Sequence, residues 1–148
     1  MDWQPHITVA TVVEDRGRFL LVEEFAEGRA VFNQPAGHLE ADESLLQAAL
    51  RETLEETGWD IELTGVIGIY LYTAPSNGVT YQRVCFAARP VRHHPQLALD
   101  EGIIGPRWLS REELAVQPQR WRSELVLRCI DDYLAGEVFP LTLIRDPA

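Results

Sequence analysis

Three glutamates, Glu52, Glu55 and Glu56, follow Arg51 closely in the chain. On a helix, positions i, i+3 and i+4 project within an arc of about 100°, so these three carboxylates would share one face. Glu52 and Glu56 are like charges four residues apart, which disfavours an isolated helix, and no lysine follows at helical spacing to neutralise them. A hard divalent cation, which prefers oxygen ligands, is the expected counter-charge: Mg²⁺, with Mn²⁺ as a substitute.

Such an arrangement suits chemistry on phosphates. Mg²⁺ in proteins binds through one or two carboxylates together with substrate phosphates, and it activates water for attack on phosphorus. Arg51 is one residue before Glu52 and four before Glu55, so its guanidinium can orient a carboxylate of the site. The alternative interpretation is a solvated acidic helix face, with Arg51 in a surface ion pair of little energetic value.

The helix that would carry these residues has well-marked ends. Ser44 and Gln47 form a capping-box pattern, and Gly58 suits the position after a helix, so the sequence predicts a helix from about Leu45 to Thr57. The side expected to pack against a sheet consists of Leu46, Ala49, Leu50, Thr53 and Thr57.

The rest of the chain alternates between strand-like and helical patterns. Two hairpins are expected, and the second turns at Asn77-Gly78, a dipeptide that tolerates the positive φ of a tight turn. A short strand, a capped helix start at Ser110 and a final helix follow an irregular segment. These elements predict an α/β sandwich, a mixed sheet flanked by helices, in a single domain over residues 1–148. The expected segments are 7–13, 18–22, 61–73, 79–88, 90–102 (irregular), 107–109, 110–113 and 123–134.

The charged and glycine positions from Gly37 to Trp59 form a longer pattern. Gly37, Glu43, Arg51-Glu52, Glu55-Glu56 and Gly58 fit Gly-x5-Glu-x7-Arg-Glu-U-x-Glu-Glu-x-Gly-U, in which U is a bulky apolar residue. This string resembles the box of the Nudix hydrolase family, whose fold is a mixed sheet between helices. Two positions depart from the pattern, Thr53 in place of an aliphatic residue and Trp59 in place of a smaller one.

The resemblance implies a role for each matched residue. Glu55 and Glu56 would bind the metal, and Glu52 would be a further ligand or the base that activates water. Arg51 would orient Glu52, and Gly37 would turn the chain so that its carbonyl can reach the metal.

Other residues are expected at the margins of this site. Glu43 would be a structural or outer carboxylate near the start of the helix. In many family members the base comes from a later loop, for which Asp100 and Glu101 are the candidates here, and we predict Glu101. A polar loop without a catalytic role is the alternative for both.

Residues 34–43, 133–136 and 139–141 resemble the NudJ-type phosphatase branch of the family. This implies hydrolysis of nucleoside tri- and diphosphates and of hydroxymethylpyrimidine pyrophosphate, with release of phosphate. Two alternatives stay open. Pro75, 16 residues after Trp59, is near the place where ADP-ribose pyrophosphatases of the family carry a proline, although turn formation also explains it. A Nudix-like domain that senses a nucleotide without cutting it is the other alternative.

Four residues are predicted to contact the substrate. Arg29 and Arg83 could meet phosphates, His38 could donate to a phosphate, and Phe32 could stack on a heterocycle. Ordinary structural roles explain each of them as well. Further aromatic candidates for stacking are Tyr70, Tyr72 and Trp121.

Charge and composition limit the partners. A net charge of -10 disfavours long nucleic acids and anionic membranes, whereas a small nucleotide-like anion can bind if a cation bridges it. Cys85 and Cys129 lack CxxC spacing, and the N-terminus lacks a signal-like apolar run. We therefore expect a cytoplasmic protein, monomeric or homodimeric, that has no membrane partner.

Overall fold

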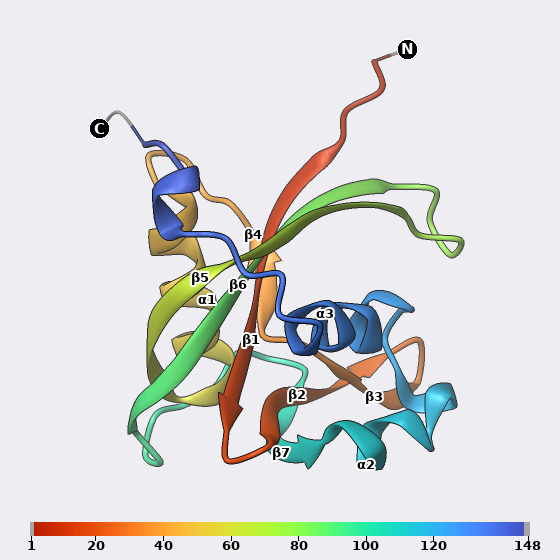
Figure 1. The fold of residues 1–148 in the computed structure, drawn as a ribbon. Helices are drawn as coiled ribbons and strands as arrows, with labels where there is room; N and C mark the ends of the chain where they lie inside the picture. The colour runs from red at the N-terminus through yellow and green to blue at the C-terminus, as the bar shows by residue number, and fades with distance from the viewer. Residues whose placement is uncertain (1, 147–148) are drawn as a thin grey trace.

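The computed structural model describes residues 2–146. Within this range a mixed seven-stranded sheet has the order β3-β2-β1-β6-β5, with β4 paired to β1 and β7 paired to β2 (Figure 1). Strands β1 and β6 run parallel, and the other pairs run antiparallel. The elements are β1 (His6–Asp15), β2 (Arg18–Ala26), β3 (Arg29–Asn33), β4 (Ala36–His38), α1 (Leu45–Thr57), β5 (Trp59–Thr73), β6 (Thr80–His93), β7 (Ile103–Ser110), α2 (Arg111–Ala115), α3 (Leu125–Leu134) and the short 3-10 helices Pro118–Arg120 and Leu141–Leu143.

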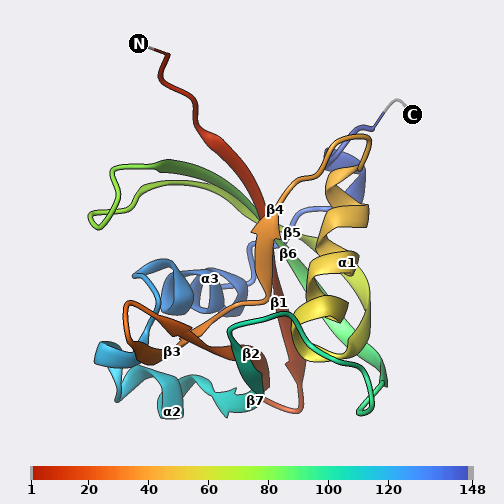
Figure 2. The ribbon, with the colours of Figure 1, turned by 180° about the vertical axis from the view of Figure 1, so that it is seen from behind.

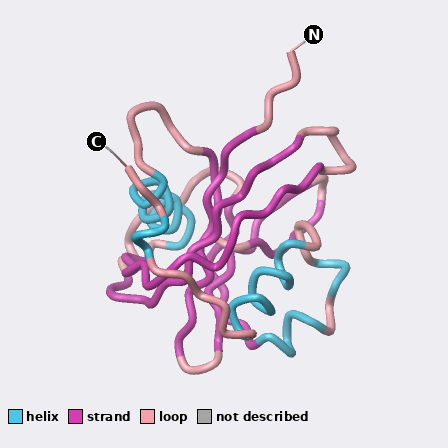
Figure 3. Tube along the Cα trace, turned by 45° about the horizontal axis from the view of Figure 1, so that its top comes forward, coloured by secondary structure: helices cyan, strands magenta, loops and turns pink. Residues whose placement is uncertain are grey.

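Alternation along β1 places apolar side chains on both faces of the sheet. Ala10 and Val12 belong to the buried cluster that includes α3, whereas Val9 and Val13 belong to the cluster that includes α1. Opposite views show α1 on one side of the strands and α3 on the other (Figures 1 and 2). The tube drawing shows the same separation (Figure 3). The predicted α/β sandwich is therefore confirmed.

Helix α1 begins and ends where its capping residues predict. The backbone N–H of Gln47 donates to Ser44 Oγ at 3.0 Å, and the N–H of Ser44 donates to Gln47 Oε1 at 2.9 Å. Gly58 has φ 75° and donates its N–H to the Leu54 carbonyl at 2.9 Å. Both ends are thus fixed by local hydrogen bonds, which sets the rotation and register of the acidic face.

The packed side of α1 differs from the prediction at one position. Ala49, Thr53 and Thr57 are buried as expected, and Ala48 is buried as well. Leu50 is 41% exposed, so its predicted place in the core is wrong. On the helix, Leu50 lies at the edge of the group of residues that face the sheet.

Strand β6 is longer than its sequence pattern indicates. It continues through Pro90 to His93 and pairs with the start of β5, where the register shifts between Asp60 and Ile61. The prediction of irregular structure at residues 90–93 is wrong, because a bulge accommodates the proline that would otherwise interrupt the ladder. None of the helices within residues 2–146 has the length and apolar character of a membrane span.

Thr53, the unusual residue of the box, has a structural function. Its Oγ1 lies 2.9 Å from Thr11 Oγ1 and donates to the Ala49 carbonyl at 2.8 Å, and both threonines are fully buried. We expect Thr53→Val to lower the free energy of unfolding by about 1–3 kcal/mol, because the Thr11 hydroxyl loses its partner. Turnover per folded molecule should not change. Chemical denaturation measures the first effect.

A double substitution is the control for this prediction. Thr11→Val combined with Thr53→Val removes both partners, so its loss of stability should be smaller than the sum of the two single losses. Additive losses would show that the hydroxyl pair contributes nothing.

Candidate functional site

Three carboxylates from two segments meet beside α1. Ligand oxygens of Glu52, Glu55 and Asp100 all lie within 4.8 Å of one another. The segment before β7 supplies Asp100, and its backbone N–H donates to the Glu55 carbonyl at 3.3 Å. Carboxylates held so close together repel one another, and hard oxygen donors are the ligands that Mg²⁺ and Mn²⁺ prefer. The donor set therefore fits a divalent metal ion.

Arg51 is the counter-charge that lies within this cluster. Its Nη1 donates to Glu52 at 2.7 Å and to Glu55 at 3.3 Å, and it lies 3.2 Å from Glu40. Its Nε and Nη2 donate to the two oxygens of Glu43 at 2.6 and 3.0 Å. These bonds lower the pKa of Glu43 and raise that of Arg51. Arg51 thus joins the helix to the preceding loop and fixes the orientation of Glu52.

Gly37 allows the chain to pass directly against Glu52. A Cβ at position 37 would lie 2.2 Å from the Glu52 carboxyl carbon, so any larger residue there would force the Glu52 carboxylate out of this position. The next residue, His38, accepts a hydrogen bond from Arg51 on its carbonyl at 3.1 Å. The loop backbone and the Glu52 carboxylate are therefore held in contact, where the resemblance places a ligand carbonyl.

Glu56 lies one turn after Glu52 in a more buried position. It accepts a hydrogen bond from the Ala36 N–H at 2.9 Å. Burial raises its pKa to about 8, with the negative charges of Glu52 and Glu24 acting in the same direction. Burial also raises the pKa of Glu52. A cation placed between these carboxylates would reverse both shifts.

A cavity of about 490 Å³ opens beside this acidic site. Ala36, Gly37 and Glu56 are among its lining residues, so the cavity and the acidic side of α1 share a wall. The arm formed by the β5–β6 hairpin extends over α3 and supplies another wall (Figures 1 and 2). The remaining lining residues are Thr8, Glu24, Ala26, Glu27, Arg29, Val31, Asn33, His38, Tyr72, Ala74, Pro75, Ser76, Asn77, Tyr81, Arg83, Arg122, Ser123 and Leu125.

Three of the four predicted substrate contacts line this cavity. Arg29 donates to the Gln119 carbonyl, His38 Nε2 lies 3.0 Å from a ring nitrogen of His6, and Arg83 is buried. Phe32 is 3% exposed and belongs to the core. The guanidinium carbon of Arg120 lies 4.3 Å from the centre of its ring, so the Phe32 face is already occupied.

The structure separates the other predicted residues by environment. Both acids in the later loop are exposed, and of the two Asp100 belongs to the carboxylate cluster. Of the additional aromatic candidates, Tyr72 lines the cavity. The other two are bound within the fold, because Tyr70 donates to Asp132 at 2.7 Å and Trp121 Nε1 donates to the Leu114 carbonyl at 2.8 Å.

Sequence reasoning missed Glu24, Asn33, Tyr81 and Arg122, which also line the cavity. One of them carried a readable signal. Tyr72 and Tyr81 are direct partners across the hairpin that the Asn77-Gly78 turn predicts. The others come from separate elements, and local pattern does not bring them together.

Comparisons with known proteins agree with this arrangement. Residues 3–128 match the model of the NUDIX domain. Phosphatase NudJ of Escherichia coli strain K12 is 42% identical over 144 residues, which cover 97% of this chain and 93% of NudJ. A solved NUDIX hydrolase from Nitrosomonas europaea is 43% identical, with a TM-score of 0.94 and coverage of 97% of both chains. The MutT NUDIX hydrolase of Burkholderia pseudomallei, 19% identical with a TM-score of 0.74 over 87% of this chain and 98% of its own, shares the fold. This chain therefore belongs to the Nudix hydrolase family.

Proposed function

We propose that this protein is a Mg²⁺-dependent phosphatase of nucleoside tri- and diphosphates, and of hydroxymethylpyrimidine pyrophosphate, that releases phosphate. The observation that carries the proposal is the carboxylate group Glu52, Glu55 and Asp100 beside a cavity that contains arginines. The similarity to Phosphatase NudJ supports the release of phosphate, and the resemblance of residues 34–43, 133–136 and 139–141 to the NudJ-type branch implies these substrates.

The residues that would hold the metal are Glu52, Glu55, Glu56 and Asp100, with the carbonyl of Gly37. When bound, Mg²⁺ neutralises phosphate charge and lowers the pKa of a coordinated water. The protein supplies the positions of these oxygens. Arg51 holds Glu52 in place, and the Ala36 N–H holds Glu56.

A carboxylate must accept the proton of the attacking water. Glu52 is suited to this role because Arg51 holds its carboxylate in a fixed position against the Gly37 backbone. The loop acids, Asp100 and Glu101, are the alternatives. Asp100 has the geometric advantage, since it lies among the other carboxylates.

Paired substitutions separate the two loop acids. We expect Asp100→Asn to lower kcat by about a hundred-fold, since it removes a charge from the cluster, and Glu101→Gln to lower kcat less than about threefold. Steady-state phosphate release at saturating Mg²⁺ measures both. A larger loss in Glu101→Gln would return the catalytic role to Glu101.

A substrate panel tests the function itself. The protein would be incubated with nucleoside di- and triphosphates, hydroxymethylpyrimidine pyrophosphate and ADP-ribose, with Mg²⁺, with Mn²⁺ or with chelator, and the products identified. Phosphate release that requires the metal is the expected result. Cleavage of ADP-ribose alone would indicate a nucleoside-diphosphate-X pyrophosphatase. Tight nucleotide binding without turnover would indicate a sensor.

Arg29 tests the separation of the cavity from the metal site. It lines the cavity and donates to the Gln119 carbonyl, whereas the carboxylate cluster comes from α1 and the segment before β7. We expect Arg29→Ala to raise KM about five- to tenfold through loss of a phosphate contact, with unchanged metal affinity. Mn²⁺ titration followed by electron paramagnetic resonance provides the metal readout. Loss of Mn²⁺ binding in this variant would contradict the assignment of Arg29 to the substrate.

A further inference from the structure

Two tyrosines form one wall of the cavity. Tyr72 and Tyr81 are directly paired across the β5–β6 arm, and both are half-buried and line the cavity. Asn77 Nδ2 donates to the Tyr81 hydroxyl at 3.2 Å, and the Tyr81 ring makes an edge contact with His6 at 5.5 Å between centroids. The ring of Tyr81 is thus held in place without a ligand. A fixed aromatic side chain is a surface on which a planar heterocycle stacks.

Strands β2 and β3 supply polar groups from the sheet. The β2–β7 register shifts between Glu23 and Glu24. Glu23 is buried and ion-paired to Arg120, whereas Glu24 lines the cavity. The extra residue at this shift is Ile104 of β7, and both glutamates keep regular pairing with β3, Glu23 with Phe32 and Glu24 with Val31. Alternation along β2 therefore directs the two side chains to opposite faces, one into a structural ion pair and the other to the cavity.

Neighbouring side chains determine what Glu24 can do. Arg83 donates to Asn33 Oδ1 at 3.3 Å, and this bond leaves the amide nitrogen of Asn33 as a donor. The Glu24 carboxyl group lies close to the Arg122 guanidinium and the Asn33 side chain, which oppose the rise in its pKa that burial causes. A carboxyl group has several acceptor lone pairs, so Glu24 retains acceptor capacity beside these neighbours. The cavity therefore contains an acceptor that a ligand can reach.

We infer that the cavity is a heterocycle subsite in which the Tyr72–Tyr81 wall stacks the ring and Glu24 accepts a hydrogen bond from an exocyclic amino group. The inference rests on the proposed function and specifies its substrate class. Cytosine, adenine, guanine and amino-substituted pyrimidines carry such a group. Uracil and hypoxanthine present a carbonyl oxygen instead, and this oxygen would face the carboxylate without a proton between them.

The site should discriminate between amino-bearing and carbonyl-bearing heterocycles, because a carbonyl oxygen facing Glu24 costs binding free energy. A buried acceptor left without a donor loses its solvation without compensation, and sites built around such a hydrogen bond reject the analogue that lacks it. Stacking does not distinguish the two heterocycles, because each has a planar face. Glu24 should therefore determine how much more tightly an amino-substituted heterocycle binds than its carbonyl analogue. The tyrosines should determine how tightly both heterocycles bind.

The test is calorimetric binding of cytidine and uridine 5′-monophosphates to the full chain without divalent metal. This measurement needs no turnover, so it stays informative even if no nucleoside phosphate is cleaved in the substrate panel. We expect cytidine monophosphate to bind about tenfold more tightly than uridine monophosphate. In Glu24→Gln, whose amide both donates and accepts, the ratio should fall below about threefold. In Tyr81→Leu both affinities should fall about tenfold and the ratio should persist.

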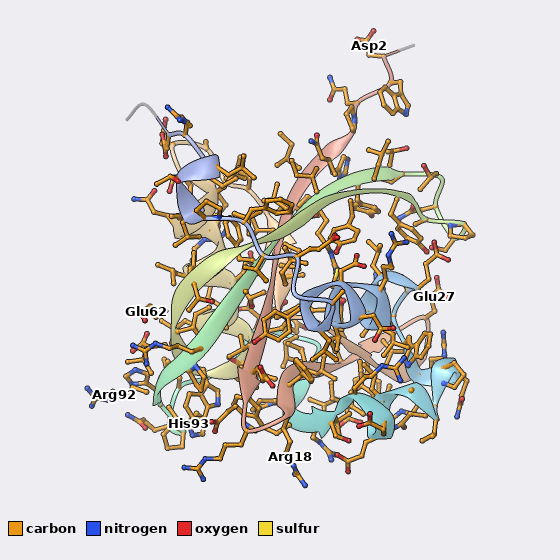
Figure 4. All side chains as sticks on the ribbon, viewed as in Figure 1. Asp2, Arg18, Glu27, Glu62, Arg92 and His93 are labelled. Atoms are coloured by element: carbon orange, nitrogen blue, oxygen red, sulfur yellow. The ribbon has the colours of Figure 1, made fainter. Side chains whose placement is uncertain are left out.

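Glu62→Gln is the matched control, because Glu62 pairs with Arg89 on the exposed surface. Glu62 lies at the opposite side of the molecule from Glu27, which lines the cavity (Figure 4). The Glu62→Gln variant should bind cytidine and uridine monophosphates with the affinities, and the ratio of affinities, of the wild type. Circular dichroism confirms that each variant is folded. Equal binding of the two nucleotides by the wild type, or binding of neither, would overturn the inference.

Discussion

Glu56→Gln is expected to lower kcat for phosphate release by about a thousand-fold, which corresponds to about 4 kcal/mol of transition-state stabilisation. Glutamine keeps an oxygen that can accept from the Ala36 N–H, which Glu56 binds at 2.9 Å, so the fold should persist. It lacks the negative charge that a hard cation requires. Steady-state kinetics at saturating Mg²⁺ measure the loss. Glu62→Gln should retain full activity.

The same substitution has an expected signature in stability. The pKa of Glu56 in the folded protein is raised by burial from 4.5 to about 8. Ionisation is therefore easier in the unfolded chain, and the stability that protonated Glu56 provides is present below pH 4.5 and is lost as the pH rises to about 8. Without metal, Glu56→Gln should melt at a higher temperature than wild type at alkaline pH and not at pH 4.

Thermal melts in chelator at several pH values measure this difference. If the melting temperatures of wild type and Glu56→Gln changed with pH in the same way, the ionisation of Glu56 would cost no stability. Mg²⁺ should reduce the difference, because binding to the ionised carboxylate stabilises the wild type. The kinetic and stability effects thus report one buried charge in two independent ways.

Arg51→Ala should be the most destabilising change at the site. It removes the counter-ion of Glu43 and Glu52, each of which is 13% exposed, and it detaches the loop from the helix. Leaving partly buried charges unpaired costs about 3–5 kcal/mol, and the loss of an orienting partner costs about ten- to hundred-fold in activity. Chemical denaturation and Mg²⁺-dependent kinetics measure the two effects.

Two variants make this result interpretable. Arg51→Lys should recover only part of the loss, since an ammonium group does not form the two-pronged contact with Glu43. Arg89→Ala breaks an ion pair whose side chains are 58% and 57% exposed, so it should change stability by less than about 0.5 kcal/mol. If Arg51→Ala were as mild as Arg89→Ala, the hydrogen bonds of Arg51 would have no organising effect.

The parts of the site that the sequence predicts are those fixed by local rules. The Ser44 cap and Gly58 determine where α1 begins and ends, and the helical period then determines that Glu52, Glu55 and Glu56 share a face. Each of these features depends on residues close together in sequence, for which spacing carries the geometry. The position of Gly37 at the site is different, because only the resemblance to the Nudix box implied it, and the structure adds its contact with Glu52.

The remaining parts depend on contacts between distant segments. Asp100, and not Glu101, joins the cluster because its N–H bonds to the Glu55 carbonyl, and neither residue type nor spacing distinguishes the two acids. Phe32 is a plausible stacking residue in sequence, but the Arg120 guanidinium covers its ring. Glu24 lines the cavity next to a bulge between β2 and β7, and two strands must be aligned before that bulge can be recognised.

The most direct measurement is the anomalous difference density of a crystal soaked in Mn²⁺. A peak bound by the carboxylates of α1, with Asp100 or the Gly37 carbonyl beside it, is the expected result. Soaked crystals that bind no Mn²⁺ at these oxygens, or bind it only elsewhere on the protein, would contradict the metal-dependent hydrolysis proposed for this chain.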